Sequence, residues 1–145
     1  MIYPTDIVKT ARSYIGTPFH HRERQPGVAL DCVGLLVCAA RELGIYPPDF
    51  DVPRYTPHPD GKTMLALCRE FMTEVPQERM QLGDAVAVFI NDRPQHLGIA
   101  GDYRNNHFSI IHASNDQRLM RVVEMRLMFS KHFRFAGAFR FPGVT

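Results

Sequence analysis

The sequence Asp31-Cys32-Val33-Gly34-Leu35-Leu36 carries the strongest structural signal in this chain. An aspartate suited to cap a helix stands before a thiol and an apolar run. This pattern predicts a helix that ends at Gly44, with Cys32, Leu35, Leu36, Ala39 and Leu43 on one face. The free N–H groups of a helix start favour a thiolate, so Cys32 is a candidate nucleophile. Inert packing is the alternative, because free cysteine is often buried.

One further helix is expected on each side of this one. Apolar residues at helical spacing follow Thr5 and stop at Gly16, and a second such pattern covers about residues 62–74. The segments between the helices are rich in proline and charge. We expect residues 17–30 to form a surface loop leading to the thiol, and residues 45–61, with five prolines, to form an extended linker.

The apolar period changes after Gly83-Asp84, where short β-rich segments alternate with turn residues. These segments cover residues 85–90, 97–100, 108–111, 119–123 and 133–141. Helices first and strands second is typical of an α+β domain, so we expect N-terminal helices packed on a single antiparallel sheet. The length of 145 residues and 45% hydrophobic content fit a single domain over residues 1–145.

Charge and cysteine content argue against several functional classes. The net charge is only +2 and the basic residues are dispersed, so no nucleic-acid binding is expected. No apolar run is long enough for stable membrane insertion, and the N-terminus lacks the pattern of a signal peptide. The three cysteines, 32, 38 and 68, form no C-x-x-C, which argues against a disulfide framework or a zinc knuckle.

Two histidines at expected strand ends are candidate partners of the thiol. His96 opens the segment after the loop of residues 91–95, where an imidazole can serve as base to Cys32 and then as acid to a leaving amine. His112 ends the next strand, where it can orient the first ring. Taken singly, each is more simply a solvated or backbone-bonded histidine.

The remaining polar clusters carry weaker signals. The pairs His20-His21, Asp49/Asp51 and Arg22/Arg24 fit solvated surface loops. A metal site built from His20, His96, His112 and Cys32 has no close ligand pair to support it, so no metal is expected.

Taken together, the motifs resemble the NlpC/P60 family of papain-like cysteine peptidases. The matching elements, in family order, are Asp31-Cys32-x-Gly34-Leu35, Leu82-Gly83-Asp84, His96-x-Gly98-Ile99 and Ile111-His112-Ala113-Ser114. Gly16-Thr17-Pro18-Phe19 resembles the family's segment before the cysteine. The amino-acid sequence from Pro18 to Leu35, with Gly137-Ala138-Phe139-Arg140-Phe141, is similar to the phage-encoded, tail-associated branch of that family.

The resemblance implies a papain-like NlpC/P60 fold and a Cys-His-His triad. It assigns Cys32 as nucleophile, His96 as base and His112 as the orienting member, with no cofactor required. The implied substrate is the peptide stem of bacterial peptidoglycan, commonly cut between a γ-linked D-glutamate and a diamino acid. The implied setting is a phage or prophage tail, with tail proteins as partners, which would bring a chain made in the bacterial cytoplasm to the cell wall. Release at lysis is the other route.

Substrate contacts are implied for Asp31, Phe19, His20 and His21. Asp31 matches the residue that in relatives meets the substrate's free amine, although a helix cap explains it equally well. Family members often have a tyrosine hydroxyl before the cysteine; here Phe19 has none, and His20 or His21 is the candidate replacement donor. Val33 stands where many members have serine. The alternatives are a tail-tip assembly component with little catalysis, and a thiol amidase or acyltransferase.

Overall fold

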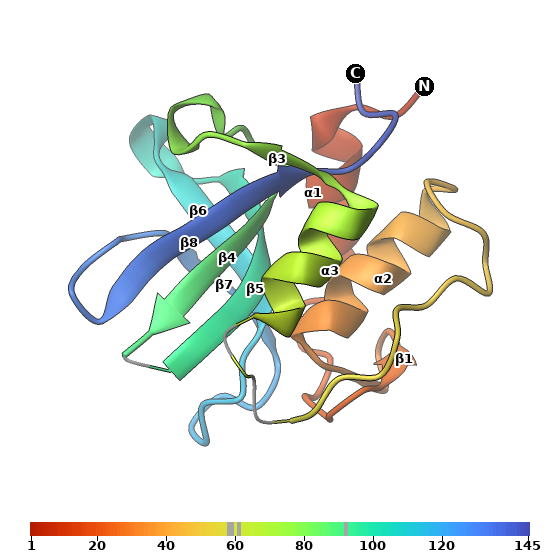
Figure 1. Ribbon diagram of the computed structural model, residues 1–145, viewed down its shortest axis with the longest axis horizontal. Helices are drawn as coiled ribbons and strands as arrows, with labels where there is room; N and C mark the ends of the chain where they lie inside the picture. Colours follow the sequence, from red (N-terminus) through yellow and green to blue (C-terminus); the bar gives the residue numbers. More distant parts are fainter. Residues whose placement is uncertain (58–59, 61, 92) are drawn as a thin grey trace.

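The computed structural model describes residues 1–57, 60, 62–91 and 93–145. Three helices cover one face of an antiparallel β-sheet of six strands (Figure 1). The predicted α+β architecture is therefore confirmed. Residues 58, 59 and 61 of the expected linker, including Pro59, and Asp92 of the expected loop before His96 lie outside the described residues.

The three helices are α1 (Pro4–Ser13), α2 (Cys32–Glu42) and α3 (Thr63–Phe71). Each lies where the apolar spacing predicts it, and Gly44 has the positive φ of 71° expected of a left-handed cap. Ile15 is 46% exposed, because it follows the helix end at Tyr14 and so leaves the buried face. Within the described residues, none of the helices is long and apolar enough to cross a membrane.

The large sheet has the strand order β3-β8-β4-β5-β6-β7. The C-terminal strand therefore lies inside the sheet and pairs with β3 and β4. The strand bounds are β3 Thr73–Val75, β4 Ala85–Ile90, β5 Arg93–Asp102, β6 Phe108–Ala113, β7 Val122–Arg126 and β8 Phe133–Arg140. Short 3-10 turns cover Gln77–Arg79 and Arg104–Asn106.

Several expected bounds are wrong. The loop expected over residues 91–95 ends early, because β5 begins at Arg93, so His96 lies within the strand and not at its start. The third helix stops at Phe71, because Thr73–Val75 pairs with β8 as an edge strand. The strand expected over 119–123 runs instead over Val122–Arg126, since Leu119 and Met120 belong to a turn in which Met120 has φ 46°. The loop of residues 17–30 contains a small hairpin, β1 (Arg24–Gln25) with β2 (Ala29–Leu30).

The main core lies between the helices and the sheet. Ile99 of β5 and Ile111 of β6 are fully buried there, in one cluster with Leu35 of α2. The other face of the sheet carries a smaller apolar cluster around Val86 and Val88 of β4. Because successive strand residues point to opposite faces, both faces of β4 are apolar, which matches its uninterrupted apolar sequence.

A buried ion pair joins the start of β4 to the end of β8. Asp84 is 1% exposed, and its carboxylate accepts hydrogen bonds from Arg140 Nε at 2.9 Å and Nη2 at 3.0 Å, and from the N–H of Gln81 at 2.9 Å. A buried carboxylate needs such partners. The Leu82-Gly83-Asp84 motif is thus accounted for by the turn that leads into the sheet.

Candidate active site

Cys32 is the first residue of α2, and Asp31 caps the helix. The Asp31 Oδ1 atom accepts a hydrogen bond from the N–H of Gly34 at 2.7 Å. A Cβ at Gly34 would lie 2.4 Å from a carbonyl oxygen of the preceding loop, so glycine is required for this close approach. As a whole residue, Cys32 is partly exposed, whereas Cys38 and Cys68 are buried. Of the three cysteines, all of which the structure describes, Cys32 is the least buried residue.

The Asp31 carboxylate is only 2% exposed and accepts several protein donors. Besides Gly34, Arg24 Nη1 donates to Oδ1 at 3.0 Å, and the N–H of Arg22 donates to Oδ2 at 2.7 Å. The Tyr55 hydroxyl also donates to Oδ2. The predicted helix cap is confirmed. Its carboxylate is turned into the protein, where four donors occupy it.

Arg24 and Asp51, which we expected in solvent, belong to the same network. The Arg24 side chain is only 10% exposed, and its Nε donates to Asp51 Oδ1 at 3.1 Å. Its Nη2 donates to the Tyr55 hydroxyl at 2.8 Å. The expectation is wrong because Asp31 is buried, and a buried carboxylate requires a charged partner. These contacts fasten the proline-rich segment to the start of α2.

His96 of β5 and His112 of β6 form a buried pair. His96 Nε2 lies 2.6 Å from His112 Nδ1, and the two rings meet edge to face with their centres 4.8 Å apart. The two residues are 9% and 5% exposed. Burial lowers the pKa of His112 to about 4, and burial together with the neighbouring ring lowers the pKa of His96 to about 3. Both rings are therefore neutral near pH 7.

The strand register brings the two rings together. Ile99 pairs with Ile111, so extending the ladder by one residue places Gly98 opposite His112, with His96 diagonal to it on the same face. A Cβ at Gly98 would lie 2.5 Å from an Ile110 side-chain carbon and 2.9 Å from the carbonyl oxygen of Ile111. Glycine leaves the room that the close approach of the strands needs.

The Cys32 sulfur lies beside the strand that carries His96. The backbone N–H of Leu97, the residue after His96, is close enough to the sulfur to lower the thiol pKa, as are the N–H groups of Cys32 and Val33. Burial and then the Asp31 carboxylate outweigh them and raise the pKa of Cys32 to about 12. The expected helix-start effect is present, but the net shift is opposite to our expectation.

The resting site therefore holds a neutral thiol and a neutral imidazole. Among the described residues, no hydrogen bond joins the Cys32 sulfur to His96, and His96 Nδ1 has no hydrogen-bond partner. Of the two nitrogens of His96, Nδ1 is therefore the one left to act as a base. The third predicted member, His112, occupies the other nitrogen of His96.

The expected substrate contacts before Cys32 fall in three different places. Phe19 packs against the main core, and its backbone bridges Leu30. His20 is exposed, and its Nδ1 lies 3.3 Å from the carbonyl oxygen of His21. His21 is half-buried, with Nδ1 3.9 Å from Asp31 Oδ2 and its ring edge-on to Tyr55 at 5.5 Å. His21 thus adjoins the capping network, whereas the contact recorded for His20 is with the backbone of His21 and not with that network.

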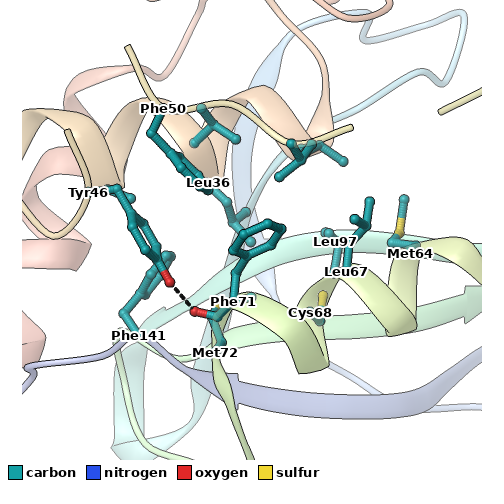
Figure 2. Close-up of a pocket in the computed structure, with 14 residues that line it drawn as sticks. Leu36, Tyr46, Phe50, Met64, Leu67, Cys68, Phe71, Met72, Leu97 and Phe141 are labelled. Carbon is teal, nitrogen blue, oxygen red and sulfur yellow. Dashed lines mark hydrogen bonds between the residues drawn. The ribbon is translucent and has the colours of Figure 1, made fainter. Parts of the chain in front are cut away.

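An apolar cavity of about 50 Å³ lies between α2, α3 and the segment after α2 (Figure 2). Tyr46 closes one end, where its hydroxyl donates to the carbonyl oxygen of Phe71. No charged side chain lines it, so it offers packing space and no catalytic group. Its lining residues are Val33, Leu36, Val37, Ala40, Tyr46, Phe50, Val52, Met64, Leu67, Cys68, Phe71, Met72, Leu97 and Phe141.

A second cavity, of about 140 Å³, begins at Val33, directly after the thiol. It is more polar, and Arg54 and Tyr55 contribute to its wall. In the described part of the chain, no group of three or more histidine, cysteine or acidic residues is arranged to hold a metal ion. Arg54 and Asp60 both line the polar cavity, so it presents a cation and a carboxylate next to the residue that follows Cys32.

Sequence reasoning missed two residues of this site. Tyr55 reaches the cap of α2 from the proline-rich segment, and Met125 of β7 contacts His112 Nε2 through its sulfur at 3.2 Å. The position of Tyr55 among prolines gives no helical or strand signal, although a tyrosine in an expected linker is a reason to look for a buried partner. Met125 lay just beyond the expected strand, so its register could not be assigned.

Comparison with known proteins identifies the fold through structure and not through sequence. No family model matches the chain, and no curated protein matches it. The NlpC/p60 domain of the peptidoglycan hydrolase SagA is similar in structure, with a TM-score of 0.60 and 20% identity over 97% of this chain and 100% of that domain. NlpC2 from Trichomonas vaginalis has a TM-score of 0.65 and 16% identity over 96% of this chain and 46% of its own.

A further similar structure is an N-acetylmuramoyl-L-alanine amidase from Bacteroides uniformis. Its TM-score is 0.56, with 12% identity over 95% of this chain and 98% of the amidase. The chain spans the whole SagA domain but less than half of the Trichomonas protein. At these identities the comparison establishes the fold, which is the predicted α+β arrangement of NlpC/P60 domains.

Proposed function

We propose that this chain is a cysteine hydrolase that cleaves the peptide stems of bacterial peptidoglycan. One observation carries the proposal: the backbone N–H of Leu97, the residue after His96, lies close to the Cys32 sulfur at the start of α2, and His96 Nε2 is 2.6 Å from His112 Nδ1. A nucleophile, a base and a group that orients the base are the parts that thiol acyl transfer needs. A chain with only structural duties does not require two buried, neutral imidazoles at this place.

The reaction would begin with proton transfer from the Cys32 thiol to His96 Nδ1 as the sulfur attacks the scissile carbonyl. The raised thiol pKa supports transfer during attack rather than a preformed ion pair. The backbone N–H of Cys32, which has no intrahelical acceptor at the first position of α2, would donate to the developing oxyanion. The C–N bond then breaks, and His96 returns the proton to the leaving amine.

Hydrolysis of the resulting thioester completes the cycle. Water attacks the acyl carbon while His96 accepts a proton from it, and the tetrahedral intermediate expels Cys32, which regains a proton. Across both half-reactions one water is consumed, and one amine and one carboxylate are released. His112 holds the ring of His96 throughout, and the chain's own residues supply every group that these steps use.

The finer proposal is an endopeptidase acting between a γ-linked D-glutamate and a diamino acid, carried in a phage or prophage tail. The sequence resemblance described above supports both parts. The polar cavity beside Val33 has Arg54 and Asp60 in its wall, which would offer a cation to a substrate carboxylate and a carboxylate to a substrate amine. Tail proteins would be the partners, and delivery by the tail would bring the site to the cell wall.

The test is digestion of purified sacculi followed by mass analysis of the released peptides. We expect the native protein to release fragments with a new amino terminus at the diamino acid. The Cys32→Ala variant should release none, whereas Cys38→Ala, a change at a buried cysteine on the same helix, should retain cleavage. Cleavage by Cys32→Ala would refute the nucleophile assignment.

An amidase is the second candidate, because an N-acetylmuramoyl-L-alanine amidase shares this fold. The same digestion separates the two reactions. Intact stem peptides released from bare glycan chains would assign amidase activity, and shortened stems would assign endopeptidase activity. No release by native protein from any sacculus tested would favour the alternative of a tail-tip assembly component.

A further inference from the structure

A thioether contacts the outer nitrogen of the histidine pair. Met125 Sδ lies 3.2 Å from His112 Nε2, on β7, the strand next to the one that carries His112. The opposite nitrogen of the same ring, Nδ1, is 2.6 Å from His96 Nε2. Sulfur, His112 and His96 therefore form one chain of contacts that leads from the rim of the site to the candidate base.

The chemistry of the thioether determines where the protons sit in this chain. A thioether sulfur has no hydrogen and can only accept a hydrogen bond. His112 must therefore carry its proton on Nε2. The lowered pKa of His112, about 4, keeps the ring neutral near pH 7, so its Nδ1 holds a lone pair.

The tautomer of His112 in turn determines that of His96. Because His112 Nδ1 accepts, His96 must donate through Nε2–H. A neutral imidazole carries one proton, so the remaining nitrogen of His96, Nδ1, is unprotonated. This is the nitrogen without a hydrogen-bond partner among the described residues, and the one that must receive the thiol proton.

We propose that Met125 is a positioning residue whose thioether sets the tautomers of His112 and His96, leaving His96 Nδ1 free to act as base. The proposal rests on the proposed function, because it concerns the base of that reaction. A hydrogen-bond donor at position 125 would reverse the direction of these hydrogen bonds and change the tautomer of both rings. It would place a proton on His112 Nδ1 and hence on His96 Nδ1. A fully populated wrong tautomer has cost up to about 10⁴-fold in kcat in an enzyme with this kind of triad.

Three variants separate this role from simple packing. Met125→Glu supplies an acceptor, Met125→Lys supplies a donor of similar length, and Met125→Leu supplies bulk alone. Met125 is 44% exposed, so polar side chains should be tolerated. At about pH 8, above the ordinary histidine pKa, we expect Glu to retain kcat, Leu to lower it several-fold and Lys to lower it at least about tenfold.

The second measurement is the ¹⁵N spectrum of the imidazoles, which requires no substrate. In native protein both rings should show a protonated Nε2 and a bare Nδ1, and Met125→Lys should exchange these signatures in both rings. A proton on His96 Nδ1 in native protein would overturn the proposal. So would full activity in Met125→Leu and Met125→Lys.

The two measurements keep this proposal separate from the proposed function. If native protein cleaves nothing but shows the expected ¹⁵N pattern, the hydrolase assignment fails and the tautomer assignment stands. If native protein cleaves sacculi but the ¹⁵N pattern is reversed, the hydrolase assignment stands and the role of Met125 is refuted.

Discussion

Asp31 gives the sharpest test of the site, because the structure predicts opposite effects of its removal on stability and on the thiol. Asp31→Ala removes a helix cap, which costs about 1 kcal/mol. It also leaves the largely buried Arg24 without its carboxylate at 3.0 Å. Breaking a buried pair costs about 3–5 kcal/mol, and we take the lower value or somewhat less, because Arg24 keeps Asp51 as a partner.

The expected loss for Asp31→Ala is therefore about 3–4 kcal/mol, or a lowering of the melting temperature by about 10 °C for a chain of this size. Asp31→Asn is the matched control, because its amide oxygen still accepts from Gly34 while the charge is lost. We expect it to recover about 1 kcal/mol, the contribution of the cap. Urea unfolding of the three proteins measures these differences.

The thiol should respond in the other direction. The Asp31 carboxylate is the second cause, after burial, of the raised pKa of Cys32, so Asp31→Asn should lower that pKa from about 12. Alkylation of Cys32 by iodoacetamide at a fixed alkaline pH should then be faster in the variant. Buried Cys38 serves as an internal control, because its modification would report opening of the fold.

A variant as stable as native protein would refute the account of the network. Unchanged or slower alkylation of Cys32 in a folded Asp31→Asn protein would refute the electrostatic account of the thiol. Either result can occur without the other, so the two parts of the reasoning are tested separately.

Three further outcomes follow from the fold. The pKa values of His96 and His112 are lowered to about 3 and 4, so below about pH 6.5 the unfolded chain binds more protons than the folded chain. The free energy of unfolding should therefore be level above that pH and fall by about 2 kcal/mol per histidine at pH 5. Urea unfolding of the His96→Gln/His112→Gln variant should show a weaker dependence on pH. Gly98→Ala should lower stability by about 1–3 kcal/mol, since its Cβ would meet atoms at 2.5–2.9 Å, and a native-like unfolding midpoint would contradict this packing argument. Arg140→Ala should lower the free energy of unfolding by about 3 kcal/mol, because it leaves the buried carboxylate of Asp84 without its charged partner. Arg118→Ala, at an exposed ion pair, should leave the unfolding midpoint unchanged. Equal effects of the two changes would show that burial does not govern the contribution of these ion pairs.

Elements with a strong period could be predicted from the sequence. The helix that begins at Cys32 has an N-cap, an apolar face and a C-terminal glycine, and the structure contains all three. The small hairpin in residues 17–30 and the edge strand Thr73–Val75 could not be predicted, because strands of two or three residues have no measurable period. Their pairing is decided by partners elsewhere in the chain.

In the candidate site, too, some residues could be predicted from the sequence and others could not. Motif order alone indicated Cys32, His96 and His112, and the structure places the two histidines in contact. The contributions of Tyr55 and Met125 come from segments more than ten residues away from the residues they contact. Such contacts depend on register and loop path, which local sequence does not encode.

The sequence by itself determined where the three helices and the longer strands form and which side chains are candidates for the chemistry, because hydrophobic period, capping residues and glycines act over a few neighbouring positions. Only the tertiary structure decided the electrostatics of those side chains. Burial and Asp31 raise the pKa of Cys32, and burial lowers that of His96, because the free energy of a charge depends on the solvent and partners that packing leaves around it. The candidate nucleophile could be identified from the sequence, but its protonation state follows from the fold.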